Sequence, residues 1–236
     1  MIEANETDSQ YFLQDLNNLA FAPRYQRWQF DLIRPYLKGK VLEIGGGIGS
    51  FTELIADHAD SVISLEPNSY CYEVLLKKAI NNRKVKLYRA QIEQYTGEPG
   101  TFDCVVLMNV LEHIEDDLLT CQKALQMLKP GGKLIFLVPA MPWAFGKLDT
   151  LLGHYRRYTV ASTYSLLNTA GFNPQFVKYY NPIGALAWWW NAKICKKTKQ
   201  SPYQIKLFDR VIFPACKWMD HLELPFGQSL LAVAIK

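Results

Sequence analysis

Cysteine and histidine are scarce in this chain, and the few that occur are not grouped. Its 236 residues include five cysteines and four histidines, and no two cysteines stand in a C-x-x-C pair. This spacing excludes the common zinc and dithiol motifs, and single thiols inside apolar runs usually behave as small buried hydrophobic groups. We therefore expect reduced cysteines and a cytoplasmic location.

Long apolar runs are also missing. No stretch of the sequence approaches the roughly 20 residues that a membrane-spanning helix needs, and the polar, acidic start at 1–6 is unlike a secretory signal. Hydrophobic residues make up 49% and charged residues 20% of the chain, which is the balance of a globular protein. Since there are neither internal repeats nor low-complexity linkers, we expect a single domain over 1–236.

The most informative segment is an apolar run that ends in glycines. Residues 41–44 are Val-Leu-Glu-Ile, a composition typical of a buried parallel strand, and glycine-rich residues 45–49 follow directly. Glycine permits a tight turn and lets a ligand approach the backbone closely. The spacing differs from the G-x-G-x-x-G fingerprint of dinucleotide sites. Glu43 would repel a pyrophosphate, but it suits a ligand that carries an ammonium or sulfonium group.

The pattern at 43–49, Glu-x-Gly-x-Gly-x-Gly, resembles the E/D-x-G-x-G-x-G signature of class I methyltransferases, which use S-adenosylmethionine. Later segments agree with this family in order and spacing. Residues 61–66 form a second predicted strand that ends in an acid, where such sites place a carboxylate against ribose hydroxyls. The run 109–114, Asn-Val-Leu-Glu-His-Ile, resembles the family's fourth motif, and its later residues are predicted to open a helix.

The resemblance implies an α/β fold, a doubly wound, Rossmann-like sheet of seven strands in which the last strand is antiparallel. The predicted strands are 41–44, 61–66, 85–90, 102–108, 134–138, 174–179 and 229–235. Helices are predicted at 10–37, divided at Pro23, and at 159–170, with a loop at 139–158. A helical insertion at 181–226 would form a lid together with the N-terminal helices. These elements divide the chain into a helical cap (1–38), a cofactor-binding core (39–138), a substrate-side part (139–226) and a final strand (227–236).

The resemblance also implies which residues hold the cofactor. Glu66 is the expected ribose ligand, and Gln91 would meet the adenine amino group, although Asp is commoner at that position. The start of 109–114 would lie against the methionine part of S-adenosylmethionine. The expected set is Tyr25, Glu43, Gly45, Gly46, Gly47, Gly49, Glu66, Pro67, Gln91, Ile92, Asn109, Val110 and His113.

The candidate catalytic residue is His154. It stands on the segment after the fifth strand, at the crevice end of an open sheet, and histidine titrates close to neutral pH. A general base is needed only if the acceptor atom carries a proton. Tyr155, Arg156, Arg157 and Trp188 are the candidate substrate residues, since guanidinium groups suit a carboxylate or phosphate. The alternative is a structural loop, in which an arginine pairs with an acid or a helix end and His154 is merely exposed.

One segment also allows a metal interpretation. Glu112, His113, Glu115 and Asp116 resemble the cluster that binds a divalent ion in some quinone-pathway O-methyltransferases. The same Glu-His pair occurs in metal-free relatives, where the histidine lies beside the cofactor. Acids in the first turn of a helix are also favoured by its dipole. We therefore expect no metal.

Another segment joins tryptophans to lysines. Residues 188–190 are three tryptophans, and between 191 and 217 seven basic residues stand against one acid, Asp209. Such a segment suits a weak membrane-surface contact through 184–199. The segment also suits a helix that packs its tryptophans over a substrate cavity and exposes its lysines to solvent. We favour this second interpretation. No nucleic-acid partner is expected, because the basic patch lacks a recognisable binding module.

The expected function is therefore S-adenosylmethionine-dependent methyl transfer to a small, hydrophobic acceptor, with oxygen as the favoured atom. The run 153–158, Gly-His-Tyr-Arg-Arg-Tyr, with Tyr25 and Trp28 upstream, resembles a bacterial subgroup of small methyltransferases that often accompany sugar, lipid or secondary-metabolite pathways. N- or C-methylation would need no different cofactor site. Two alternatives stay open. One is an enzyme that binds the same cofactor without transferring its methyl group and assists a cyclisation; the other is a membrane-surface binding module.

Overall fold

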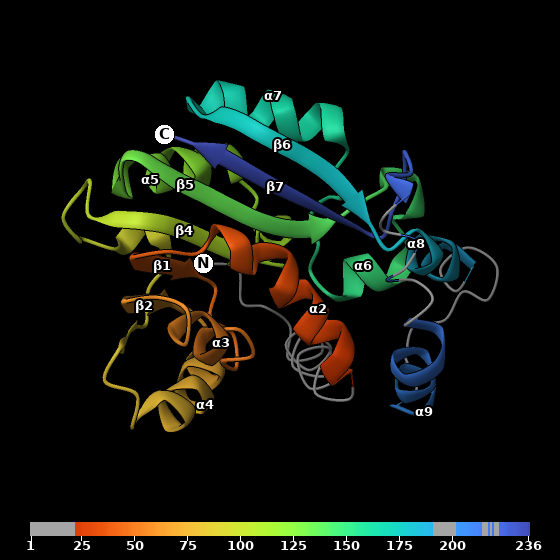
Figure 1. The fold of residues 1–236 in the computed structure, drawn as a ribbon, viewed down its shortest axis with the longest axis horizontal. Helices are drawn as coiled ribbons and strands as arrows, with labels where there is room; N and C mark the ends of the chain where they lie inside the picture. Colours follow the sequence, from red (N-terminus) through yellow and green to blue (C-terminus); the bar gives the residue numbers. More distant parts are fainter. Residues whose placement is uncertain (1–21, 191–201, 214–216, 218, 220–221) are drawn as a thin grey trace.

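The computed structural model describes residues 22–190, 202–213, 217, 219 and 222–236 (Figure 1). The strands are β1 Lys40–Ile44, β2 Ser61–Leu65, β3 Val85–Tyr88, β4 Phe102–Met108, β5 Leu128–Pro139, β6 Asn173–Tyr180 and β7 Ser229–Ile235. The α-helices are α2 Pro23–Ile33, α3 Thr52–Ala56, α4 Ser69–Ala79, α5 Asp117–Met127, α6 Lys147–Leu151, α7 Val160–Ala170, α8 Pro182–Trp189 and α9 Pro202–Leu207. Short 3-10 turns are η1 Arg34–Tyr36, η2 Ile92–Gln94, η3 Leu111–His113 and η4 Pro142–Ala144, and η6 Phe208–Ile212 is a π-helix.

The strands form one seven-stranded sheet in the order β3-β2-β1-β4-β5-β7-β6. Strands β1 to β5 pair in parallel, whereas β7 runs antiparallel to both of its neighbours, β5 and β6. The predicted seven-stranded α/β fold with an antiparallel last strand is thus confirmed. The chain winds outward from β1 in one direction and from β4 in the other. Ligands in open α/β sheets bind in the crevice at such a reversal.

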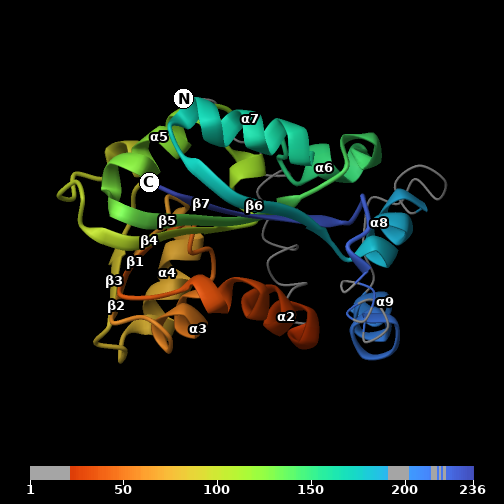
Figure 2. The ribbon, with the colours of Figure 1, turned by 45° about the horizontal axis from the view of Figure 1, so that its top comes forward.

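Both faces of the sheet are covered, which explains why its central strands are apolar at nearly every position. Along β4, Val105 and Leu107 belong to the core on one face, and Cys104 and Val106 to the core on the other. Helices α5 and α7 cover the first face, and α2, α3 and α4 cover the second (Figure 2). Helices α8 and α9 lie at the end of the sheet toward which β4, β5 and β6 point (Figure 1).

The segment between β5 and α7 is not the plain loop that the sequence predicts. It contains η4 and α6. The backbone N–H of Gly146 donates to Asp149 Oδ2 at 2.9 Å, so that an aspartate inside α6 closes the start of its own helix. The prediction that 109–114 opens a helix is also wrong. That run forms η3, and α5 begins only after Asp116, whose side chain accepts a hydrogen bond from the N–H of Leu119 at 2.9 Å.

Helix α2 begins at Pro23, where the sequence predicts a division, but residues 10–21 lie outside the described part of the chain. Its N-cap residue, Ala22, has no side chain that can cap the helix. Asp209, buried on η6, does so instead, because its carboxylate accepts from the N–H groups of Arg24 at 3.3 Å and Tyr25 at 2.8 Å. A carboxylate suits the partial positive charge at a helix N-terminus. The insertion therefore fixes the start of α2.

Helix α8 starts from a strained residue. Asn181 has a φ of +59°, in the left-handed region that asparagine tolerates better than most residues. Its Oδ1 accepts from the N–H of Gly184 at 2.9 Å, and its Nδ2 donates to Gln228 Oε1 at 2.7 Å. These bonds set where α8 leaves the sheet. In the described part of the chain, the helices are all too short or too polar to span a membrane.

Asn181→Ala should lower the free energy of unfolding by about 2 kcal/mol, because it removes a helix cap and leaves an alanine in the left-handed region. Urea unfolding followed by circular dichroism would measure this. Asn168→Ala, at an exposed position of α7, is the matched control and should change the free energy by less than about 0.5 kcal/mol. Equal effects of the two substitutions would contradict the role given to Asn181.

Candidate functional site

A cavity of about 790 Å³ lies at the carboxyl ends of the parallel strands. Its walls come from the turns after β1, β2, β3 and β4, from the segment 152–157, and from α2, α8 and α9. The sequence-predicted residues that line it are Tyr25, Gly45, Gly46, Gly47, Glu66, Pro67, Gln91, Ile92, Asn109, Val110, His113, His154, Tyr155, Arg157 and Trp188. Three predicted residues do not line it, namely Glu43, Gly49 and Arg156.

The glycine turn packs directly against the segment that follows β4. Gly45 has a φ of +77°, and a Cβ placed on it would lie 2.5 Å from Val110 Cγ2. Any side chain would therefore push the two turns apart. The N–H groups of Gly45 and Gly46 both donate to the carbonyl of Leu65, at 2.8 and 3.1 Å, which fixes the turn against the end of β2. The backbone itself thus forms one wall of the cavity.

Glu66 is the carboxylate that faces this wall. It is 4% exposed, its Oε2 accepts from the N–H of Gly47 at 2.7 Å, and its Oε1 accepts from the N–H of Asn68 at 2.8 Å. Burial raises its pKa above the usual range, against the effect of these two hydrogen bonds. Each carboxylate oxygen offers about two acceptor positions, so the group retains capacity for a ligand that donates hydroxyl protons.

Glu43 has a different place from the one that the sequence predicts. It is buried below the turn, and its Oε2 accepts from Thr52 Oγ1 on α3 at 2.7 Å. Burial raises the pKa of Glu43, and the neighbouring hydroxyl groups of Ser64 and Thr52 oppose the shift. Gly49 likewise packs on the protein interior, because a Cβ there would lie 2.9 Å from Leu75 Cδ1. These residues hold the turn in place and do not face the cavity.

Positive charge is rare on the cavity wall. The described residues that line it include five carboxylic acids, Glu66, Glu93, Glu112, Glu115 and Asp116, and a single arginine, Arg157. Such a wall suits a cation and disfavours a pyrophosphate. Asn109, at the end of β4, adds an amide from a left-handed conformation with φ +54°, held by its N–H bond to the carbonyl of Leu137 at 2.8 Å.

His154 and His113 meet at one end of the cavity. Their ring centroids are 4.6 Å apart and the rings are nearly perpendicular. Burial, and to a lesser extent the charge of His154, lowers the pKa of His113 to about 3, so this ring is neutral at ordinary pH. His154 Nδ1 lies 3.0 Å from Asp149 Oδ1. His154 is therefore oriented by a buried carboxylate and is not merely an exposed loop residue.

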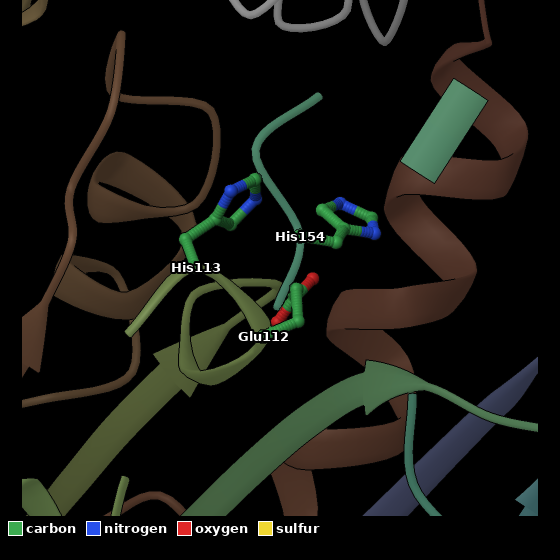
Figure 3. A group of neighbouring side chains, drawn as sticks. All are labelled: Glu112, His113 and His154. Atoms are coloured by element: carbon green, nitrogen blue, oxygen red, sulfur yellow. The ribbon is translucent and has the colours of Figure 1, made fainter. Parts of the chain in front are cut away.

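The carboxylate of Glu112 lies close to these two rings. Figure 3 shows Glu112 and His113, from the turn after β4, beside His154 from a different segment. One ligand atom of each lies within 4.8 Å of the others. Two imidazoles and a carboxylate can hold a divalent transition metal. Glu115 and Asp116, which the metal interpretation of the sequence included, are not part of this group.

The two arginines have separate roles. Arg157 is buried; its Nε donates to Asp149 Oδ1 at 2.7 Å, its Nη1 donates to the carbonyl of Ala140 at 3.1 Å, and its guanidinium lies 4.7 Å from the centroid of the Trp188 ring. Arg156 points elsewhere. Its Nη1 forms an ion pair with Asp117 at 2.7 Å, as in the structural alternative that the sequence left open. Of the three tryptophans at 188–190, Trp188 is the one that lines the cavity, together with Gly184 and Ala187, and 191–199 lies outside the described residues.

Sequence reasoning missed several residues of the wall. Gln29 is 2% exposed, lines the cavity, and its Oε1 has no hydrogen-bond partner among the described residues. It lies four residues after Tyr25, on the same face of α2, and that spacing is the signal that could have found it. No sequence signal marks Asp149, because only the folding of α6 brings it next to His154 and Arg157.

Comparison with known proteins shows related sequences and the same fold. A family model described as a methyltransferase domain matches residues 10–193. Among curated proteins, the ubiquinone biosynthesis O-methyltransferase of Aliivibrio fischeri is 33% identical over 99 residues, which are 41% of this chain and 42% of that protein. This chain thus matches less than half the length of that relative.

Solved structures extend the likeness over most of the chain. An S-adenosylmethionine-dependent methyltransferase from Mesorhizobium loti has a TM-score of 0.62 at 18% identity, covering 88% of this chain and 95% of that one. A cyclase has a TM-score of 0.63 at 18% identity, covering 89% and 81%. At such identities these structures establish the fold alone.

Substitution of Glu66 and of Glu43 should distinguish a residue that lines the cavity from a residue that supports the glycine turn from below. We expect Glu66→Gln to weaken the binding of S-adenosylhomocysteine by about 1–3 kcal/mol, because a hydrogen bond to a charged group is lost. Glu43→Gln should leave the affinity within about twofold, since its amide oxygen can still accept from Thr52. Isothermal titration calorimetry measures both values. An equal loss of affinity in the two variants would contradict this assignment.

Proposed function

We propose, on the premise that this chain belongs to the methyltransferase domain family and is a class I S-adenosylmethionine-dependent methyltransferase, that it methylates a hydroxyl oxygen of a small molecule. The proposal rests mainly on one observation, that a histidine oriented by a carboxylate lies in the same cavity as Glu66 and the glycine turn. The O-methyltransferase named above supports the choice of oxygen.

The described residues fit the cofactor. Glu66 retains acceptor positions for a ribose diol, and Gln29 Oε1 is a buried acceptor that an ammonium group would satisfy. The acidic wall suits the positive charge of a sulfonium. Gln91 and Ile92 line the cavity beyond the end of β3, where the adenine is expected. When bound, the cofactor supplies an electrophilic methyl group on sulfur.

The residues of this chain supply position and a proton acceptor. Arg157 and Trp188 pack against each other on the cavity wall and would line the acceptor end. His154 takes the proton of the hydroxyl as the oxygen becomes a nucleophile. His113, neutral through burial, adds no competing positive charge. Most of the rate would come from holding the oxygen in line with the methyl group.

His154→Ala should lower kcat by about 100-fold or more, because a positioned general base typically contributes at least that factor. The affinity for S-adenosylhomocysteine should stay within about twofold. The assay incubates the protein with phenols, aliphatic alcohols, amines and carboxylic acids, and follows S-adenosylhomocysteine release and a product about 14 mass units heavier.

His58→Ala is the matched control for this test. His58 is exposed, and its Nδ1 bonds to the carbonyl of Leu54 on the far side of α3, so its replacement should not change kcat. A His154→Ala variant that keeps full turnover would rule out the base. Methylation confined to the amines would rule out the hydroxyl acceptor. A cofactor that binds tightly while no acceptor gains mass would favour the cyclisation alternative.

Metal assistance is the second candidate at the same place, favoured by the approach of Glu112, His113 and His154. If His154 acts as a base, turnover should survive dialysis against EDTA within about twofold. If the three side chains hold a divalent ion, turnover should disappear and return when Mn²⁺ or Zn²⁺ is added. Metal analysis of the dialysed protein accompanies the assay, and recovery with a metal would replace the base mechanism.

A further inference from the structure

One buried carboxylate organises the acceptor end of the cavity. Asp149 is 0% exposed. Its Oδ2 accepts from the N–H of Gly146 at 2.9 Å, and its Oδ1 accepts from Arg157 Nε at 2.7 Å and lies 3.0 Å from His154 Nδ1. Two N–H donors and one imidazole nitrogen therefore converge on the two oxygen atoms.

The protonation of this group follows from its partners. Arg157, which stays protonated, forms an ion pair with Asp149 Oδ1 at 2.7 Å, and the N–H of Gly146 donates to Oδ2, so the carboxylate is ionised. An ionised carboxylate has no proton to donate. The hydrogen between Asp149 and His154 must therefore sit on Nδ1 of the histidine. In the neutral ring the lone pair is then on Nε2.

We propose that Asp149 is the positioning residue for His154, fixing the Nδ1–H form of the ring so that Nε2 is the atom that receives the proton of the acceptor. This inference rests on the proposed role of His154 as the base. Asp149 itself does not line the cavity, so it acts through His154 and touches no reacting atom.

Arg157 keeps this carboxylate in place. The guanidinium is held on two further sides, by the carbonyl of Ala140 and by the ring of Trp188. Because Arg157 Nε and His154 Nδ1 share one oxygen, Asp149 cannot turn away from the histidine without also breaking a buried ion pair. His113 packs on another side of the His154 ring and limits its rotation. Asp149 thus connects the proposed base, His154, with Arg157 on the part of the cavity wall that would hold the acceptor.

The first test measures the tautomer and needs no acceptor. Long-range ¹H–¹⁵N correlation spectra of the protein saturated with S-adenosylhomocysteine report which nitrogen of His154 carries hydrogen, and His154→Ala assigns the signals. We expect the Nδ1–H form in the wild type. In Asp149→Asn, one accepting oxygen faces three donors, so the Nε2–H form should become detectable. A wild-type ring in the Nε2–H form would overturn the proposal, as would an unchanged spectrum in Asp149→Asn.

Asp117→Asn is the matched control. Asp117 also forms an ion pair with an arginine, Arg156, but the structure places it beside Tyr158 and not beside His154. Asp117→Asn removes the same charge and likewise leaves an arginine without its carboxylate partner. We expect it to change neither the His154 spectrum nor kcat. A change in the spectrum as large as that in Asp149→Asn would mean that the tautomer responds to charge in general, and the proposal would fail.

The second test uses enzyme kinetics to distinguish a positioning role of Asp149 from a merely structural one. On an acceptor that the wild type methylates, Asp149→Asn should lower kcat about tenfold or more while the KM for S-adenosylmethionine stays within about twofold. In a His154→Ala background it should cause no further loss, because the residue acts through the histidine. A further loss of similar size in that background would overturn the proposal. If no acceptor reacts, the proposed function fails while the spectra still decide the role of Asp149.

Discussion

The parallel pairing of β1 with β4 is the constraint on which the rest of the structure depends. It aligns Ile44 with Leu107, so the two strands end at the same edge of the sheet. The glycine turn and the run after Met108 must then begin side by side, and they fit only because Gly45 carries no Cβ toward Val110. The cavity residues that follow β1 and those that follow β4 are brought together by this pairing.

Three buried acids complete the site, and each accepts hydrogen bonds from the protein on both of its oxygens. Glu66 holds the glycine turn, Asp149 holds His154 and Arg157, and Asp209 caps α2 from 184 residues away. Burying a carboxylate without hydrogen-bond partners would cost free energy. Each of these acids therefore fixes the relative positions of segments that the sheet does not itself hold together. The cavity wall is consequently rigid where the proposed chemistry needs fixed distances.

The sequence predicts well whatever is encoded locally. All seven strands were found, because two buried faces make each central strand a short apolar run, and the helix at 159–170 shows its Thr159 cap and its terminal Gly171 directly. Asp149 and Asp209 could not be predicted, since their partners are brought to them by tertiary packing. Glu43 was misplaced for a related reason. A carboxylate next to a glycine turn can face either side of it, and here the hydroxyl of Thr52 on α3 favours the interior.

The fold by itself does not distinguish methyl transfer from other uses of the same cofactor, because a cyclase matches this chain as well as a methyltransferase does. The distinction must therefore lie in side chains at the acceptor end. A [4+2] cycloaddition transfers no proton and so needs no base, whereas a hydroxyl acceptor must lose its proton to a defined atom. In our proposal, the buried contacts of Asp149 with Arg157 and His154 define such an atom. This buried ion pair, and not the sheet, is thus the observation that supports our proposal of transfer to oxygen.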